Sequence, residues 1–266
     1  MLSYQHSYHA GNMADVHKHA MLAWMLDYLT RKDKPLTYLE THAGRGLYDL
    51  TADESIKTQE AERGIVIVEA GKWFTADDPY SRVLDMTRGR YGATSYPGSP
   101  LIAAQMLRPD DSIHLAELHP QEHAALQDVM VDYSAIAHKV DGLAMALGRT
   151  PPMPRRGLML MDPSFEVKTD YDALPTLIQN VHKKWNVGIL MLWYPILAKQ
   201  PHLGMLRQLQ AMNLPGAIRH EVSFPPARPG HGMTGSGLFI VNPPFGTADR
   251  AANLSKVFDR DLKRGR

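Results

Sequence analysis

A carboxylate and an aromatic ring follow a run of apolar residues near the middle of the chain. Residues 157–161 read Gly-Leu-Met-Leu-Met, which is typical of a strand buried in a parallel sheet, and Asp162-Pro163-Ser164-Phe165 comes directly after it. At the end of a strand, an aspartate can accept both N–H bonds of an exocyclic amino group while an aromatic ring stacks on the base. Asp-Pro also opens ordinary turns, so these four residues leave a turn without chemistry as an alternative.

Three other strand-like runs also end in residues that suit ligand binding. Gly44 and Gly46 follow the first run and allow a ligand to approach the backbone closely. Glu117 follows the second run, where an acid can accept hydrogen bonds from both hydroxyls of a ribose. Asp141-Gly142 follows the third run, where a carboxylate can accept from an adenine amino group. Taken singly, these features also have ordinary explanations as a glycine-rich turn, a solvated charge and an Asp-Gly turn.

The order of these features along the chain is more informative than any one of them. Ligands of doubly wound sheets bind outside the carboxyl ends of the strands. A glycine loop, an acid for ribose, an acid for adenine and an amine-binding loop on four successive strands describe an S-adenosylmethionine site beside an amino-methylation site. The tetrapeptide at Asp162 then corresponds to the (Asp/Asn/Ser)-Pro-Pro-(Tyr/Phe/Trp) loop of amino-methyltransferases, with Ser164 in place of the second proline.

A second tetrapeptide competes for the same role. Asn242-Pro243-Pro244-Phe245 matches the loop pattern better than residues 162–165 do. It follows the last strand-like run, however, whereas the catalytic loop in this arrangement follows the fourth. We therefore interpret Asn242 and the two prolines as a strand terminator.

The elements that must position these residues alternate along the chain. Strand-like runs are separated by amphipathic helical patterns, which predicts an α/β fold with a mostly parallel seven-stranded sheet covered on both faces. The expected strands are 36–39, 112–116, 135–140, 157–161 and 187–193, followed by an antiparallel pair, 220–224 and 238–241, joined by a glycine-rich loop. The expected helices are 14–29, 120–133, 171–185 and 199–212.

The interval between the first two expected strands is longer than one crossover helix requires. It contains amphipathic patterns at 59–74 and 80–90, and we predict that residues 53–95 form a small helical subdomain inserted after the first strand. Basic residues could give this part a face for RNA phosphates, with an ordinary solvated surface as the alternative. They are Arg45, Arg63, Lys72, Arg82, Arg88 and Arg90, and Arg219, Arg228 and His231 flank the late glycine-rich loop at 225–237.

The composition excludes several classes of site. The 266 residues contain no cysteine, which excludes disulfides, thiolate catalysis, cysteine-ligated zinc and iron–sulfur clusters. No apolar stretch approaches the roughly 20 residues needed to cross a membrane. The first residues lack the pattern of a secretory signal. We therefore expect a cytoplasmic monomer with no membrane partner. The net charge of +1 leaves other partners undecided.

The histidines could suggest a metal site and the tryptophans a base-stacking surface, and we favour neither interpretation. Histidines are dense near the N-terminus, but His17 and His19 point to different sides of a helix, so we expect no metal site. The 4 tryptophans are expected to pack in the core and not to stack on bases. They are Trp24, Trp73, Trp185 and Trp193.

The N-terminal segment points to a particular family. It reads Tyr4-x-His6-x-x-His9-Ala-Gly-Asn12-x-x-Asp15-x-x-Lys18-His19, and with the motifs further along it resembles the bacterial 23S ribosomal RNA adenine-N6 methyltransferases. The resemblance reaches to about Phe245. Its other motifs are Thr41-His-Ala-Gly-x-Gly46, Tyr96-Pro-Gly-Ser-Pro100, Glu117-Leu-His-Pro120, Asp141-Gly142, Asp162-Pro-x-Phe-Glu166 and Leu192-Trp-Tyr-Pro195.

The resemblance implies a Rossmann-like class I methyltransferase that uses S-adenosylmethionine to methylate N6 of one adenine in 23S ribosomal RNA. It assigns catalysis to Asp162, Pro163 and Phe165, and the target base to Tyr4, His6 and Phe165. It assigns the methyl donor to Lys18, His19, His42, Gly44, Ser99, Glu117, Asp141, Gly142 and Asp162.

The mechanism expected from these residues needs no strong base. Asp162, with the carbonyl of Pro163, would accept the N–H bonds of the adenine and draw its amino nitrogen toward tetrahedral geometry, while Phe165 stacks on the flipped base. The proton can leave after methyl transfer. Two other functions stay open: a DNA or small-molecule amino-methyltransferase, and a catalytically silent nucleotide- or RNA-binding protein, which need not keep Asp162.

Overall fold

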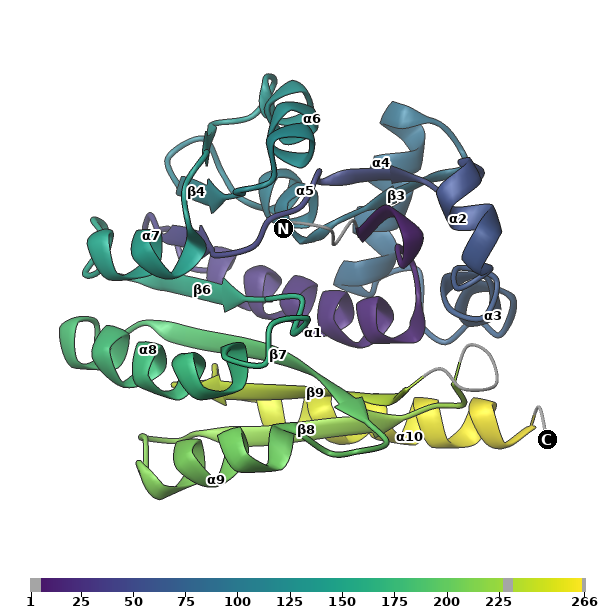
Figure 1. Cartoon of the computed structure of the whole chain (residues 1–266). Helices are drawn as coiled ribbons and strands as arrows, with labels where there is room; N and C mark the ends of the chain where they lie inside the picture. Colours follow the sequence, from purple (N-terminus) through teal and green to yellow (C-terminus); the bar gives the residue numbers. More distant parts are fainter. Residues whose placement is uncertain (1–5, 227–231, 265–266) are drawn as a thin grey trace.

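The computed structural model describes residues 6–226 and 232–264, and within them a seven-stranded sheet forms the centre of the molecule (Figure 1). The strand order is β5-β4-β1-β6-β7-β9-β8. The first five strands of this order run parallel, and β9 runs antiparallel to both β7 and β8. The predicted α/β fold with a mostly parallel sheet is confirmed. The strands are β1 Thr37–Glu40, β4 Ser112–Ala116, β5 Ala135–His138, β6 Gly157–Met161, β7 Ile189–Leu197, β8 Ile218–Ser223 and β9 Met233–Val241.

Helices cover both faces of the sheet (Figure 1). On one face α1 contacts α5 and α10, and on the other α8 lies between α7 and α9. Together with the short 3-10 helix at His6–Tyr8, the helices around the sheet are α1 Met13–Thr30, α5 Ser99–Met106, α6 Pro120–Met130, α7 Gly142–Gly148, α8 Asp170–Lys184, α9 His202–Ala211 and α10 Thr247–Arg264.

Strand β6 shows how the sequence divides the core into two layers. All of its residues are buried, and successive side chains of a strand point to opposite faces. Leu158 and Leu160 therefore pack into the core on the α1 side, and Met159 and Met161 pack into the core beneath α8 and α9. A strand buried on both faces ends at Asp162, the first polar residue after it, which places that carboxylate at the edge of the sheet.

Helix α1 is buried on nearly all sides because it lies between the sheet, α4, α5 and α10. The Asn12 side chain caps its N-terminus by accepting a hydrogen bond from the backbone N–H of Asp15 at 2.9 Å. Three successive polar residues, His17, Lys18 and His19, are at most 3% exposed. Buried polar groups need partners, so each of the three must find one in another part of the fold.

The segment between β1 and β4 contains both helices and a small ribbon. Its elements are β2 Leu47–Asp49, α2 Asp53–Thr58, α3 Ile65–Ala70, α4 Pro79–Tyr91 and β3 Ser95–Pro97, and β2 pairs with β3 antiparallel. The expected helix at 59–74 is wrong in its bounds: Gln59 ends α2 with φ of +54°, and α3 begins only after Gly64. That residues 53–95 behave as a separate subdomain stays a prediction.

Most of the basic residues of this segment are engaged in ion pairs. Four of the six that could have formed a phosphate-binding face each contact a carboxylate, so they do not form a free basic surface. The pairs are Arg45 with Glu122, Arg82 with Asp27, Arg88 with Glu69, and Arg90 with Asp132.

The competing tetrapeptide at 242–245 lies at the opposite edge of the sheet from Asp162. Because β9 runs antiparallel to β7, its C-terminal end lies where the parallel strands begin. The Asn242 amide donates to the backbone carbonyls of Asn186 and Gly188 at 2.9 and 2.8 Å, and Phe245 is 88% exposed. These contacts support the interpretation of this segment as a strand terminator.

Part of the expected glycine-rich loop belongs to a strand. Strand β9 begins at Met233, so Gly235 and Gly237 belong to the sheet and not to a loop, as expected for glycines against which other residues pack closely. A side chain at Gly237 would collide with the ring of Tyr194. Arg228 and His231 lie outside the described residues. None of the described helices is long and apolar enough to span a membrane.

Candidate active site

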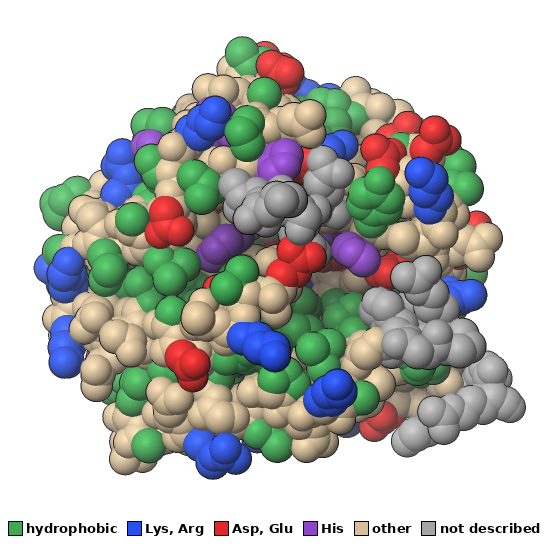
Figure 2. All heavy atoms as spheres, viewed as in Figure 1, with side chains coloured by type: hydrophobic (Ala, Val, Ile, Leu, Met, Phe, Trp, Pro, Cys, Tyr) green, Lys and Arg blue, Asp and Glu red, His purple; other side chains and the backbone are tan. Residues whose placement is uncertain are grey.

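A cavity of about 670 Å³ opens at the carboxyl ends of the parallel strands. Figure 2 shows acidic and histidine side chains near the centre of the face seen in this view. Every described residue that the sequence assigned to the site lines this cavity, whereas Tyr4 lies outside the described residues. The residues brought together are His6, Lys18, His19, His42, Gly44, Ser99, Glu117, Asp141, Gly142, Asp162, Pro163 and Phe165. Their individual roles stay predictions.

The glycine loop after β1 is held by Glu117. One carboxylate oxygen accepts the backbone N–H of Gly44 at 2.8 Å and the other accepts that of His119 at 2.7 Å. Gly44 has φ of +63°, and a Cβ atom there would lie 2.7 Å from the Tyr48 hydroxyl, so only glycine fits. Burial raises the pKa of Glu117. Each of its oxygens keeps a second lone pair for a ligand hydroxyl.

Asp141 and Gly142 form the start of α7 beside this loop. The Asp141 side chain accepts the backbone N–H of Ala144 at 2.8 Å, which caps the helix. A Cβ atom at Gly142 would lie 1.8 Å from the carbonyl oxygen of Thr41, so the glycine lets α7 pack directly onto the end of β1. The nearby His42 ring contacts the Thr41 hydroxyl at 2.7 Å, and burial lowers the pKa of His42.

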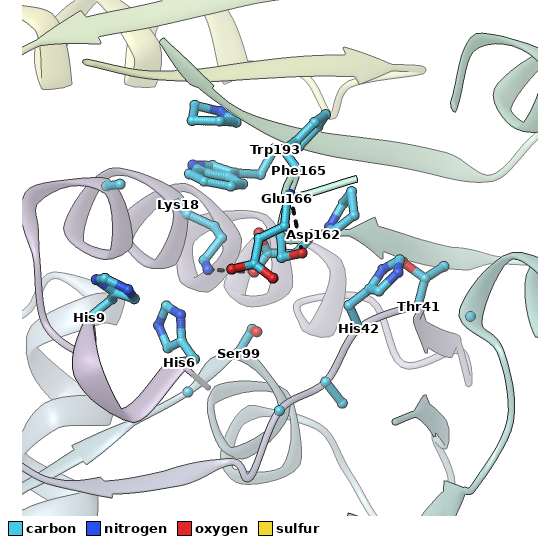
Figure 3. A pocket seen from close by; sticks show the side chains of 18 of the residues that line it. His6, His9, Lys18, Thr41, His42, Ser99, Asp162, Phe165, Glu166 and Trp193 are labelled. Atoms are coloured by element: carbon cyan, nitrogen blue, oxygen red, sulfur yellow. Dashed lines mark hydrogen bonds and ion pairs between the residues drawn. The ribbon is translucent and has the colours of Figure 1, made fainter. Parts of the chain in front are cut away.

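An ion-pair network joins α1 to the loop after β6 (Figure 3). The Lys18 ammonium donates to Asp162 Oδ2 at 2.5 Å and lies 3.1 Å from Asp15 Oδ1. Asp15 Oδ2 also contacts the His6 ring at 2.8 Å and the backbone N–H of Gly11 at 2.9 Å. The motif Asp15-x-x-Lys18 has the spacing of neighbours on one helix face, but the sequence predicted neither a role for Asp15 nor the contact between Lys18 and Asp162.

Electrostatics favours the charged forms of Lys18 and Asp15 in this network. Burial alone would lower the pKa of Lys18, but the negative charges of Asp162 and Asp15 raise it above its ordinary value. Burial alone would raise the pKa of Asp15, but His6 and Lys18 lower it. Among the described residues, Asp162 Oδ1 has no protein hydrogen-bond partner, which leaves this oxygen free to accept from a substrate.

His19 lies beside the network in the neutral form. Its Nδ1 atom contacts the Tyr96 hydroxyl at 2.9 Å, and burial lowers its pKa to about 3. The other ring nitrogen, Nε2, is buried in the cavity wall without a hydrogen-bond partner among the described residues. A buried polar atom of this kind is costly, so a bound ligand is the expected partner.

Glu40 lies beneath the cavity and is fully buried at the end of β1. It accepts hydrogen bonds from the Ser99 hydroxyl at 2.5 Å and from the Tyr38 hydroxyl at 2.9 Å. Burial raises the pKa of Glu40 to about 8, so this side chain is protonated at neutral pH. A neutral acid here limits the negative charge beneath Asp162.

We expect the Glu40→Gln variant to lose less stability than the wild type as the pH rises. Between pH 4.5, the ordinary pKa of glutamate, and about 8, folded Glu40 keeps a proton that the unfolded chain releases, so raising the pH favours unfolding. This linkage amounts to on the order of 3 kcal/mol, and glutamine abolishes it because it cannot ionise in either state. Urea unfolding at pH 5 and pH 8 measures the difference, with Glu62→Gln on the surface as the control. Equal pH dependence of wild type and Glu40→Gln would refute the neutral Glu40.

Phe165 and Trp193 form the aromatic part of the cavity. Phe165, with φ of +55°, is 7% exposed, and its ring centroid lies 4.7 Å from that of Tyr171 and 6.1 Å from that of Trp193. The expectation that the tryptophans pack in the core is incomplete for Trp193, which is half-buried, packs against the core and also lines the cavity. One signal could have found it: Trp193 follows the apolar run of its strand, as Asp162 follows that of β6.

Comparisons with known proteins agree along nearly the whole chain. The model of the family described as "Ribosomal RNA large subunit methyltransferase D, RlmJ" matches residues 33–264. The ribosomal RNA large subunit methyltransferase J of Escherichia coli is 38% identical over 260 residues, covering 96% of this chain and 91% of the relative. That of Haemophilus influenzae is 38% identical over 252 residues, covering 92% and 88%. The crystal structure of protein LPL1258 from Legionella pneumophila is similar with a TM-score of 0.86 at 34% identity, covering 96% and 94% of the two chains.

These matches confirm the resemblance drawn from the motifs. The family match shows that the chain is a methyltransferase enzyme, and its two curated relatives are named as methyltransferases of large-subunit ribosomal RNA. The family model begins at residue 33, and the match to the Escherichia coli relative extends over more of the chain. The chain therefore belongs to the RlmJ family of ribosomal RNA large subunit methyltransferases.

Proposed function

We propose that this enzyme transfers the methyl group of S-adenosylmethionine to the N6 amino nitrogen of one adenine in 23S ribosomal RNA. The observation that carries the proposal is the position of Asp162: a carboxylate at the end of β6, held by Lys18 through one oxygen and open to the cavity through the other. That oxygen suits an exocyclic amine, which offers N–H bonds and little basicity. The names of the curated relatives support large-subunit RNA as the substrate.

The residues around the glycine loop fit S-adenosylmethionine. Gly44 and Gly142 allow the loop to pack closely against Tyr48 and Thr41. The Nε2 atom of His19, which has no hydrogen-bond partner among the described residues and lies 3.8 Å from Asp15 Oδ1, offers a polar contact in the same cavity. When bound, the donor supplies an electrophilic methyl group on a sulfonium. Glu117 would accept from the ribose hydroxyls and Asp141 from the adenine amino group, as their strand-end positions predict. His42, Ser99 and Lys18 complete the set predicted to contact the donor.

On the other side of the cavity, Asp162 and its neighbours act on the target base. Asp162 Oδ1 and the Pro163 carbonyl would accept the two N–H bonds of the adenine amino group. This draws the nitrogen lone pair out of conjugation with the ring and orients it toward the methyl group. Lys18 donates to Asp162 Oδ2, and the carboxylate acts as a hydrogen-bond acceptor and not as a strong base. His6, whose ring contacts Asp15, lines the same cavity and is predicted to contact the base.

Release of the proton completes the reaction. Once the nitrogen carries the methyl group and a positive charge, it is strongly acidic and can lose a proton to water without a dedicated base. A flipped base needs stacking partners to compensate for its lost neighbours. Phe165, which lines the cavity beside Asp162, would provide one such contact.

A methyl-transfer assay with tritiated S-adenosylmethionine tests the proposal. The substrates are protein-free RNA, ribosomal subunits and DNA from a strain that lacks this enzyme, because unmodified sites are needed. We expect the label in 23S ribosomal RNA, and nuclease digestion should release it as N6-methyladenosine. Label in DNA alone would overturn the proposal in favour of a DNA methyltransferase. Donor binding without transfer to any nucleic acid would indicate a catalytically silent binding protein.

A further inference from the structure

A chain of buried hydrogen bonds links Trp193 to the far side of the core. The Trp193 Nε1–H donates to the Ser236 hydroxyl at 2.9 Å, which contacts His17 Nδ1 at 2.8 Å. His17 Nε2 contacts His220 Nδ1 at 2.9 Å, and His220 Nε2 contacts the Ser255 hydroxyl at 2.8 Å. His17 and Ser236 are completely buried. The mechanism above uses none of these polar groups.

The protons in this chain have one arrangement that satisfies Ser236. Burial lowers the pKa of His17, and it lowers that of His220 to about 4, so both rings are neutral and each carries a single N–H. Indole can only donate, so Ser236 must accept from Trp193. Among the described residues, the Ser236 hydroxyl then finds an acceptor only if it donates to His17 Nδ1. His17 donates in turn to His220, and His220 to Ser255.

This arrangement fixes the plane of the indole ring through its Nε1–H. The indole N–H donates to Ser236, so rotating the ring would break this hydrogen bond and leave the N–H without its acceptor. An incomplete buried polar network is costly, and this one spans α1, β7, β8, β9 and α10.

The sheet order places Trp193 on the RNA side of the cavity. Met161 pairs with Leu192, so Trp193 stands level with Asp162 on the neighbouring strand. The predicted donor residues follow β1, β4 and β5, on the opposite side of β6. Figure 3 shows the same division: Trp193 and Phe165 lie on one side of Asp162, and Thr41, His42 and Ser99 on the other.

The surroundings of the ring suit a nucleobase. The Lys18 ammonium lies 5.5 Å from the centroid of the indole, and the Phe165 ring stands toward it at 61°. Pro195, Leu197 and Met233 continue this wall of the cavity as apolar side chains. An apolar, aromatic wall level with the amine-accepting carboxylate is the chemistry that receives the face of a flipped base.

We propose that Trp193 contacts the target base directly, and that Ser236, His17 and His220 are positioning residues that hold its indole in the required orientation. The inference rests on the proposed function, since it assigns the RNA side of the same cavity. It predicts that loss of the indole ring, or of its hydrogen bond to Ser236, impairs RNA turnover and leaves donor binding intact.

The test compares Trp193→Phe, Trp193→Leu and Ser236→Ala, with Ser255→Ala as the matched control at the far end of the chain. We expect Trp193→Leu to lower kcat/KM for RNA by about 10-fold or more, because it removes the ring, and Trp193→Phe to lower it less. Ser236→Ala should lower kcat/KM for RNA as much as Trp193→Phe does, because both remove the same hydrogen bond. For the same reason, the double variant Trp193→Phe/Ser236→Ala should have a kcat/KM no lower than that of either single variant. Ser255→Ala should stay within about 2-fold of the wild type.

Donor affinity and thermal unfolding, measured on the same variants, separate positioning from a loss of structure. The dissociation constant for S-adenosylmethionine should stay within about 2-fold of the wild type in each variant, because Trp193 lies beyond Asp162. Wild-type kcat/KM in Trp193→Leu would overturn the inference, and so would an equal loss of donor affinity. If the wild type itself does not methylate RNA, the proposed function fails and the inference fails with it, whereas an active wild type beside an equally active Trp193→Leu variant overturns the inference alone.

Discussion

Replacing Asp162 by asparagine is expected to lower the methylation rate by about 100-fold to 1,000-fold, while the affinity for S-adenosylmethionine changes little. Asparagine is neutral and presents an N–H donor where the mechanism needs an acceptor for the adenine amino group. Lys18 would keep Asp15 as a partner at 3.1 Å, so the variant should remain folded. Single-turnover methylation of 23S ribosomal RNA measures the rate, and calorimetric titration measures donor binding.

The copy of the motif at the other edge of the sheet supplies the control. Phe245 is 88% exposed and far from the cavity, so Phe245→Ala should methylate RNA at the wild-type rate. The comparison is demanding because residues 242–245 match the amino-methyltransferase pattern better than residues 162–165 do. A fast Asp162→Asn variant together with a slow Phe245→Ala variant would reverse the assignment of the catalytic loop.

Replacing Lys18 by methionine is expected to destabilise the protein by about 3 to 5 kcal/mol. Methionine keeps the length of the side chain but removes the cation that compensates two carboxylates, whose side chains are only 2% and 13% exposed in Asp15 and Asp162. Denaturant unfolding at neutral pH measures the loss. Methylation should fall as well, because Asp162 loses the ammonium group that donates to its Oδ2 atom and holds the carboxylate in place.

Two further variants test the electrostatic origin of this effect. Lys72→Met on the exposed surface removes the same charge without a buried partner and should cost less than about 1 kcal/mol. Adding Asp15→Asn to Lys18→Met should recover part of the stability, because one buried charge is removed with its partner. If Lys18→Met alone is as stable as the wild type, the buried ion pair does not contribute in the way proposed.

The strand ends of the site could be read from the sequence because their cause is local. A strand buried on both faces is a continuous apolar run, and its first polar residue marks the edge of the sheet, as Glu117 and Asp162 do. The carboxyl ends of parallel strands share one edge, so the order of the motifs was enough to predict a common cavity. The antiparallel direction of β9 likewise explains why Asn242 lies elsewhere.

Contacts between distant segments could not be read in the same way. The pairing of Lys18 with Asp162 depends on how α1 packs against the sheet, which no local pattern specifies. The expected helix at 59–74 failed because a hydrophobic period continued through residues whose backbone turns away, with Gln59 at φ of +54°. The position of Trp193 in the cavity wall was missed because a half-buried tryptophan on a strand resembles a core residue in sequence.

The three polar residues in the middle of α1 have a consequence for how the protein folds during its synthesis. Their partners are spread along the rest of the chain. His19 contacts Tyr96, which lies 77 residues later. Lys18 contacts Asp162, 144 residues later, and His17 contacts Ser236, 219 residues later. A helix made first on the ribosome therefore becomes fully satisfied only when the last strand has been synthesised. Until then, the nascent chain carries an incomplete active site beside the RNA of its own ribosome.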